Sequence, residues 1–236
     1  MLVAAHQPAF LPWLGYLDKM ARADVFVVVD CVQYEAQNFQ NRNRIKRRDG
    51  AGWLTVPVHR GQRDNVADKQ ICQEPNPRHT WRRRIWGAIS SHYRRAPHFA
   101  RYADELHDVI AVQPWQLLVE LDLATLELAR RWLGITRPVV RSSTLGLVGA
   151  KTDRIIDLCR KVNATTYLSG AGGSAAYLDV AAMRRANVEV VWQRFVHPIY
   201  PQRHPQLGFI PNLAFIDLVL NCGPEARAIL GHEAAP

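Results

Sequence analysis

The chain has 236 residues, a formal net charge of +9 at pH 7 and 48% hydrophobic residues. This length fits one domain, or one domain with an appendage, and the apolar content is ample for a core. No apolar run approaches the roughly 20 residues that cross a bilayer, and the start MLVAAHQPAF lacks the basic and long apolar regions of a signal peptide. We therefore expect a globular protein without a membrane span.

The four cysteines are widely spaced and form no CxxC pair. This spacing is typical of a reduced, cytoplasmic protein rather than of a disulfide scaffold. Metal-binding spacings such as H-x-x-x-H and H-E-x-x-H do not occur. The sequence therefore supports no catalytic metal, and it identifies no cofactor.

The N-terminal part predicts a strand, a helix and a second strand. Residues 2–5 form a short apolar run, an apolar segment follows at 11–20, and a run of valines occupies 25–29. This order predicts a right-handed βαβ unit with parallel strands. Polar residues follow the strands at 6–7 and 30–33. Because ligands bind beyond the carboxyl ends of parallel strands, these residues predict a site at one edge of the sheet.

His6 and Asp30 are the catalytic candidates at this edge. An imidazole titrates near neutrality, so His6 suits a general acid or base; alternatively it bonds a phosphate near the following helix, or it only holds the turn. Asp30 emerges from a buried strand, where a charge is costly unless it is paired or used. Gln7 and Gln33 supply neutral hydrogen bonds. Tyr16 either packs in the core or presents its hydroxyl to a ligand.

A polar stretch after the second strand predicts a basic hairpin. Residues 49–50 form a turn signal, and 53–58 predict the returning strand. Alternation places Arg42 and Lys46 on one face of the extended segment, where Arg42 suits bidentate capture of a carboxylate or phosphate. Asn41 supplies a further neutral hydrogen bond. The alternative is an exposed basic hairpin tip.

The middle of the chain predicts helices. Apolar residues recur at helical spacing over 80–101, and two further helices are expected at 99–110 and 115–133, the last with Gly134 as its C-cap. We expect a helical insertion at about 80–134 that forms a layer or lid over the sheet.

Alternation of strands and helices resumes beyond this insertion. Short strands are expected at 139–140, 165–168 and 188–195, with a helix at 151–163. The pattern predicts a single α/β domain spanning residues 1–236, with a mainly parallel sheet in a Rossmann-like three-layer arrangement.

A glycine-rich turn, SGAGGS, follows the strand expected at 165–168. Exposed backbone N–H groups in such a turn cradle an anion; alternatively glycine serves only the tight turn. No Gly-Lys-Ser/Thr follows, so this is not a Walker loop. The candidate binding residues in the turn are Ser169, Gly170, Gly172 and Gly173.

The candidates nearer the C-terminus lie in loops and at a helix end. His197 is a second catalytic candidate, and Asp179 either orients a site histidine or arginine or caps a helix. We expect substrate contacts from Tyr177, Tyr200, Gln202 and Asn221. Residues after about 224 are expected to form a frayed tail.

The sequence also resembles a known family. Six strings are similar to the WbqC-like family, and together they cover residues 2–223 in the expected order. They are HQPAFLPWLGYLDKMARADVFVVVDCVQY, NRNRIK, WLTVPV, YLSGAGGSAAYLD, FVHPIYPQ and FIPNLAFIDLVLNCG. That family is found among bacterial surface-polysaccharide and sugar-modification genes. The resemblance implies a role in building or decorating a sugar or a related small metabolite, with acyl or aminoacyl transfer as one such activity.

The basic residues cluster in NRNRIKRR, RHTWRRRIW and HYRRAPHFAR. One interpretation is an anionic partner, either a small molecule such as a nucleotide sugar, acyl-CoA or phosphate, or a nucleic acid. The other is an arginine-rich proteome with solvated helix faces.

Three functions follow as hypotheses. The first is an enzyme that transfers an acyl or aminoacyl group to an amine, with His6 as acid or base and Asp30 or Asp179 orienting it. The second is an RNA-interacting protein, including one that takes an aminoacyl group from charged tRNA. The third is a non-catalytic metabolite-binding subunit of a biosynthetic complex.

Overall fold

The structure is a computed structural model that describes residues 1–60, 64–74, 76, 80–170, 172 and 178–231. Its centre is a sheet of five strands, paired in parallel throughout, in the spatial order β5-β2-β1-β6-β7. These strands are β1 (Leu2–His6), β2 (Val25–Val28), β5 (Val139–Arg141), β6 (Thr166–Ser169) and β7 (Glu189–Trp192). The predicted α/β class and parallel sheet are confirmed.

The order of the strands reverses next to β1. The chain first adds β2 and β5 on one side of β1, and then returns to add β6 and β7 on the other side. In open parallel sheets such a reversal opens a crevice beyond the carboxyl ends of the two strands where it occurs. The strand ends that meet here are His6 of β1 and Ser169 of β6.

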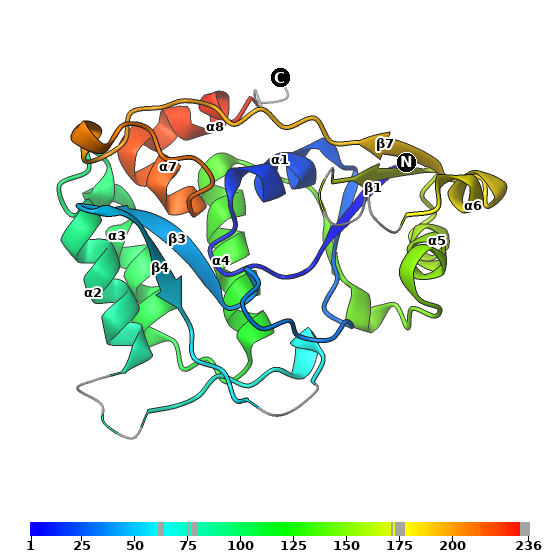
Figure 1. Ribbon diagram of the computed structural model, residues 1–236, viewed down its shortest axis with the longest axis horizontal. Helices are drawn as coiled ribbons and strands as arrows, with labels where there is room; N and C mark the ends of the chain where they lie inside the picture. Colours follow the sequence, from blue (N-terminus) through cyan, green and yellow to red (C-terminus); the bar gives the residue numbers. More distant parts are fainter. Residues whose placement is uncertain (61–63, 75, 77–79, 171, 173–177, 232–236) are drawn as a thin grey trace.

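Helices cover both faces of the sheet, because successive strand residues point to opposite sides. Ala4 and Phe26 belong to one core, shared with α1 (Leu14–Arg22), α4 (Leu118–Leu133) and α7 (Phe215–Cys222). Val3 and Val27 belong to a second core, shared with α5 (Lys151–Lys161) and α6 (Val180–Arg185). Figure 1 shows α1 and α5 on opposite sides of the strands, as the predicted three-layer arrangement requires.

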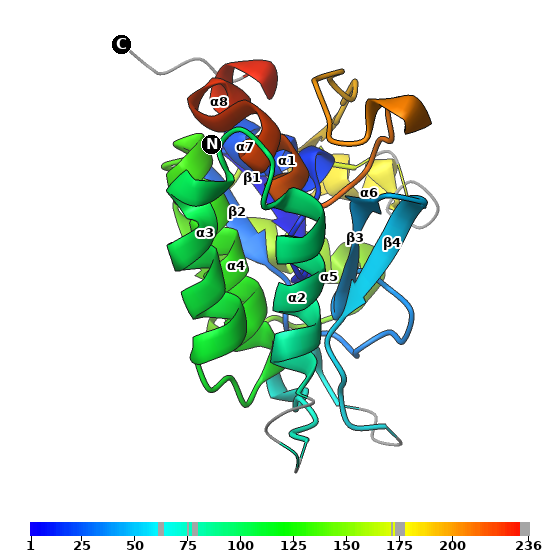
Figure 2. The same cartoon turned by 90° about the vertical axis from the view of Figure 1, so that its left-hand side faces the viewer.

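A hairpin and a group of helices lie between β2 and β5. The described part contains β3 (Arg42–Arg47), β4 (Gly50–Thr55), η1 (Val66–Asp68), α2 (Trp81–Tyr93), α3 (Phe99–His107), the π-helical turn η2 (Asp108–Val112) and α4. Figure 2 shows the hairpin beside α2, with α3 and α4 beyond that helix. The predicted helical insertion therefore forms together with a small antiparallel hairpin.

Some predicted boundaries in this region were wrong. The returning strand begins at Gly50 and not at residue 53, because Arg47 already pairs with Gly50 across a tight turn. Gly50 has φ +129°, which an L side chain rarely adopts. The helix expected at 80–101 ends at Tyr93, before Pro97. Gly134 caps α4 with φ 62°, as predicted.

Residues 223–229 are helical, so the expected frayed tail after residue 224 was wrong for this stretch, while residues 232–236 lie outside the described residues. η6 (Gly223–Glu225) and α8 (Ala226–Ile229) follow α7, with η5 (Pro205–Leu207) earlier in the same region. Ala226 and Leu230 lie one helical turn apart and are both buried in the main core. In the part of the chain that the structure describes, no helix is long and apolar enough to cross a membrane.

Candidate functional site

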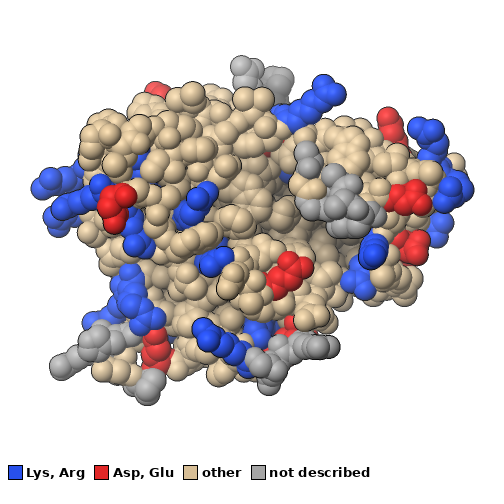
Figure 3. Space-filling view, viewed as in Figure 1, with Lys and Arg blue, Asp and Glu red and all other residues tan. Residues whose placement is uncertain are grey.

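A cleft of about 890 Å³ opens where the strand order reverses. Residues at the end of β1, in α1 and at its N-cap, in the loop after β2, on α5 and after β6 and β7 line this cleft. They include His6, Gln7, Trp13, Tyr16, Lys19, Gln33, Glu35, Phe39, Lys151, Arg154, Gly170, Gly172 and Gln193. Figure 3 shows this face hollowed beside the residues drawn in grey. The sheet topology therefore places the cleft at the edge that the sequence predicted.

His6 ends β1 and lies in this cleft. Its ring packs against Trp13 and Tyr16, with centroids 5.2 and 4.8 Å away. Burial and the nearby Lys19 charge lower the pKa of His6 to about 4, so the ring is neutral at pH 7. Its Nδ1 lies 3.0 Å from the carbonyl oxygen of Gln7, which only accepts, so the ring hydrogen belongs on Nδ1. Nε2 is then left as a proton acceptor.

Lys19 lies on α1 beside this histidine, and sequence reasoning missed it. The side chain is buried, and its Nζ donates to the carbonyl oxygen of Ala5 at 2.8 Å. Burial lowers the pKa of Lys19 to about 8. A Cβ built on Gly170 would lie 3.9 Å from Nζ, so the amine lies close to the end of β6 as well. The available signal was its spacing of three residues from Tyr16, which places both on one helix face.

Tyr16 contributes a buried hydroxyl that has no hydrogen-bond partner among the described residues. Both carboxyl oxygens of Asp122, on α4, are also buried and unpartnered. Burial, and secondarily the charge of Asp122, raise the pKa of Tyr16, and burial raises that of Asp122 well above its usual value. The cleft is therefore backed by polar groups that the fold itself leaves unsatisfied.

The electrostatics of the cleft favour an anion. Among its described lining residues, Lys19, Lys151 and Arg154 are basic and Glu35 is acidic. Helices α1 and α5 both begin here, and their N-caps, Trp13 and Ala150, supply no side-chain hydrogen bond. Helix N-termini carry a partial positive charge, which adds to that of the side chains.

Comparison with known proteins identifies the family. The WbqC-like protein family matches residues 7–229 of the chain. This protein belongs to that family. A relative from Mycobacterium tuberculosis, the "Uncharacterized protein Rv1507c", is 32% identical over 232 residues, which cover 98% of this chain and 97% of the relative. No solved structure matches. The predicted family resemblance is thus confirmed over nearly the whole chain.

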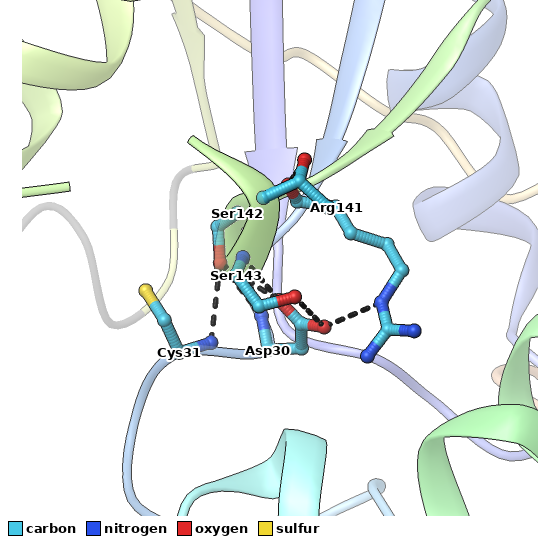
Figure 4. Close-up of polar contacts among 6 residues, drawn as sticks. Asp30, Cys31, Arg141, Ser142 and Ser143 are labelled. Carbon is cyan, nitrogen blue, oxygen red and sulfur yellow. Dashed lines mark hydrogen bonds and ion pairs between the residues drawn. The ribbon is translucent and has the colours of Figure 1, made fainter. Parts of the chain in front are cut away.

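Asp30 of this WbqC-like protein, which follows β2, binds residues at the end of β5 and not a histidine (Figure 4). Its carboxylate accepts hydrogen bonds from Arg141 Nε at 2.7 Å, from the Ser142 hydroxyl at 3.0 Å, and from the backbone N–H and hydroxyl of Ser143, both at 2.8 Å. Burial opposes ionisation, but these bonds outweigh it and lower the pKa of Asp30. The carboxylate therefore anchors β2 to β5, in place of the predicted pairing with His6.

Four predicted substrate contacts of the WbqC-like protein lie in a second buried cluster, which we call the Asp217 network. The Asp217 carboxylate accepts from the Tyr93 hydroxyl at 2.6 Å, the Tyr200 hydroxyl at 3.0 Å and Gln202 Nε2 at 2.8 Å. Lys46 Nζ donates to Gln202 Oε1 at 3.1 Å. Burial raises the pKa of Asp217, and the three donors oppose that rise.

Asn221 completes this network through its Nδ2, which donates to the backbone oxygen of Asp217 at 2.6 Å. None of these four residues lines the cleft: Lys46, Tyr200, Gln202 and Asn221. Together they join α7 and the segment before it to the hairpin and α2. These bonds hold the folded chain together, and the contact with substrate that the sequence predicted for these residues stays a prediction.

The second histidine candidate is also held within a loop. His197 Nδ1 lies 2.8 Å from the Pro198 oxygen, and Nε2 accepts from the Asn212 N–H at 3.1 Å. Its ring packs against Phe195, Tyr200 and Phe209. Of the two histidine candidates, only His6 lines the cleft.

The hairpin candidates lie outside the cleft as well. Asn41 Nδ2 donates to the Val56 oxygen at 2.8 Å, which is a structural bond. Arg42 donates to the Gln37 oxygen, and its guanidinium lies 4.3 Å from the ring centre of Trp53. Arg44 lies over the same ring at 5.7 Å. The hairpin thus presents stacked arginines and an indole that is 41% exposed.

The remaining candidates lie around the turn after β6. Asp179 is exposed and caps α6, accepting from the Ala182 N–H at 2.9 Å. Ser169 is buried at the end of β6, with its hydroxyl 3.4 Å from the Gly170 oxygen. Gly170 and Gly172 line the cleft, while Gly173 and Tyr177 lie outside the described residues. Across the described ranges, no group of three or more His, Cys, Asp or Glu could hold a metal ion.

Proposed function

We propose that this WbqC-like protein is an enzyme of sugar or small-metabolite modification that transfers an acyl or aminoacyl group to an amine. One observation carries the proposal: a neutral histidine with an accepting Nε2 lies in a cationic cleft at the strand reversal. A ligand site is expected at that position in a parallel sheet. The family's presence among sugar-modification genes agrees with a small-metabolite substrate.

The proposed reaction is a single substitution at a carbonyl carbon. The acceptor amine attacks the donor carbonyl, a carbon–nitrogen bond forms, and the bond to the oxygen or sulfur leaving group breaks. His6 Nε2 takes the proton that the amine loses and returns it to the leaving group. An anionic donor beside His6 favours the imidazolium and therefore raises the low pKa that burial and Lys19 give this histidine.

The cationic lining would hold the donor. Lys151 and Arg154 on α5 both line the cleft, so they suit the phosphates of an acyl-CoA or a nucleotide sugar. Gln7 is held by Gln40, whose Nε2 donates to its Oε1 at 2.8 Å. This bond leaves the Gln7 amide hydrogens for the substrate.

The test is a panel of acyl-CoAs and aminoacyl donors, each combined with amino sugars, with product formation followed by mass spectrometry. His6→Gln should lower turnover by about 10²–10⁴-fold, the usual contribution of a general base. His197→Gln is the matched control, because that histidine lies outside the cleft, and it should keep turnover within about threefold. Equal turnover of wild type and His6→Gln, or no product with any pair, would contradict the proposal.

A second candidate function is that charged tRNA serves as the aminoacyl donor. The stacked Arg42 and Arg44 on the exposed Trp53 favour it, because arginines and aromatic rings together bind unpaired bases. Phe39 lines the cleft and lies 5.8 Å from the Trp53 ring, which links the hairpin to the site.

This candidate is tested by tRNA binding measured against salt concentration. A steep loss of affinity with salt, reduced in an Arg42→Ala/Arg44→Ala double variant, supports it. The absence of tRNA binding at low salt eliminates it.

A further inference from the structure

The feature that neither the family match nor the sequence explains is a buried ammonium group that has no counter-charge among the residues the structure describes. The Lys19 residue is 3% exposed, and among the described residues its amine has one hydrogen-bond partner, the Ala5 oxygen. An ammonium group has three donors. None of the ion pairs among the described residues includes Lys19.

The adjacent carboxylate does not compensate this charge. Asp18 accepts from Arg22 Nε at 2.8 Å and from Gln193 Nε2 at 2.7 Å. These bonds join the buried Asp18 to the next turn of α1 and to the segment after β7, and no ion pair among the described residues joins it to Lys19. Burying a charge without a partner is costly, so proteins rarely retain one unless something binds to it.

The position of this amine is that of a ligand anchor. It lies between the carboxyl ends of the two strands at which the sheet order reverses, beside Ala5 on β1 and Gly170 after β6. His6 is close enough for the Lys19 charge to act on its ring. A group bound to Lys19 is therefore held next to the proposed base.

The other titratable side chains among the described residues that line the cleft are neutral or basic, apart from one carboxylate. His6 on β1 is neutral at pH 7, and Lys151 and Arg154 on α5 are basic. Glu35, in the loop after β2, is exposed. A neutral sugar hydroxyl would leave the ammonium charge uncompensated, whereas an anionic oxygen would neutralise it and accept its remaining hydrogens.

We infer that Lys19 is the anion anchor of this cleft: the substrate carries a compact carboxylate or phosphate that binds, buried, against the Lys19 ammonium group beside Gly170. This inference deepens the proposed function, since it names the chemical group that the same site recognises. It does not depend on acyl transfer as the reaction.

The first experiment measures anion binding by the full-length protein, with no acyl donor present. The probes are inorganic phosphate, pyrophosphate and acetate, titrated calorimetrically at constant ionic strength. At least one should bind to the wild type, and Lys19→Met should weaken that binding by about tenfold or more, as expected for loss of a charged hydrogen bond. Lys161→Met removes a lysine outside the cleft and should change affinity by less than about twofold.

The choice among the probes identifies the group. Binding of phosphate or pyrophosphate without acetate assigns a phosphate, and binding of acetate alone assigns a carboxylate. Absence of binding by all three, or equal affinities of wild type and Lys19→Met, overturns the inference. The proposed function fails separately, through the absence of product in the acyl-transfer panel.

A second readout uses wild-type protein and so does not require a folded variant. The rate at which an acylating reagent modifies Lys19 is followed by peptide mass spectrometry. The anion that binds should slow this modification by about tenfold or more, while glucose, a neutral probe, should not. Equal protection by glucose and by the anion would overturn the inference.

Discussion

The Asp217 network and the cleft contain the same kinds of side chain in opposite states. Asp217 is fully buried, and both of its carboxyl oxygens accept hydrogen bonds from Tyr93, Tyr200 or Gln202. In and behind the cleft, Lys19 has one acceptor and no counter-charge, and the Tyr16 hydroxyl and both Asp122 oxygens have no partner. One region is complete in the folded chain, and the other, under the proposal above, is completed by a ligand.

The two regions therefore differ in how far their buried polar groups are hydrogen-bonded, and not in residue type. Satisfied networks rigidify a core, whereas unsatisfied buried groups raise the free energy of the folded state. Substitutions in the two regions should therefore change stability with opposite signs. The following expectations are arranged from the largest effect to the smallest.

Asp217→Ala should lower the free energy of unfolding by about 3–5 kcal/mol, because three buried donors lose their acceptor. Asp217→Asn keeps one acceptor oxygen and should cost less. Urea denaturation of both variants at pH 7 measures the effect. A loss below about 1 kcal/mol for the alanine variant would show that the network does not stabilise the fold.

Lys19→Met should raise stability at pH 7 by about 2–3 kcal/mol. The pKa of Lys19 falls from 10.5 to about 8 on folding, so the unfolded chain binds the proton more tightly. The resulting penalty is complete below pH 8 and vanishes above pH 10.5. Urea denaturation at pH 7 and near pH 10.5 should show a gain that shrinks with rising pH. A destabilised variant at pH 7 would refute this expectation.

His6→Gln should flatten the acid side of the stability profile. The pKa of His6 falls from 6.5 to about 4 on folding, so protonation favours the unfolded chain between those values. Stability is unaffected above pH 6.5 and declines as the pH falls toward 4. At pH 5 this decline should be about 2 kcal/mol smaller in the variant. Identical slopes for the two proteins, after matching at pH 7.5, would argue against the lowered pKa.

Asp179→Ala should cost about 1 kcal/mol, the usual effect of removing a helix N-cap. Thermal unfolding measures this loss, and calorimetry with phosphate should show unchanged affinity. A tenfold weaker anion affinity of the variant would instead indicate that Asp179 contributes to the site as well as capping α6.

The sequence predicted the parts of this arrangement that depend on local pattern. Continuous apolar runs identify β1 and β2, and the polar residues that follow them place His6 and Gln7 at the sheet edge. Gly134 ends α4 because the C-cap has a left-handed backbone conformation that glycine adopts readily. These signals lie within a few residues of the feature that they determine.

The sequence did not predict pairings between distant segments. Asp30 binds residues 141–143, which local pattern does not connect to it. Lys19 is buried because β6 returns beside β1 and brings Gly170 to its amine. In the sequence, the polar residues of the C-terminal segment resemble ligand contacts. In the structure, Tyr200 and Gln202 donate hydrogen bonds to Asp217. Each of these pairings joins segments that lie far apart in the sequence or in different elements, which local pattern does not reveal.

The central position of β1 also bears on how the chain is made. β1 is synthesised well before β6, yet Leu2 of β1 pairs with Thr166 of β6. At about 5–20 residues per second, a ribosome needs roughly ten to thirty seconds to reach that partner. Until then one edge of the first strand stays unpaired, and an open strand edge is a template for aggregation. Chaperone demand during synthesis should therefore concentrate on the N-terminal βαβ unit, the same unit that carries the histidine and lysine of the cleft.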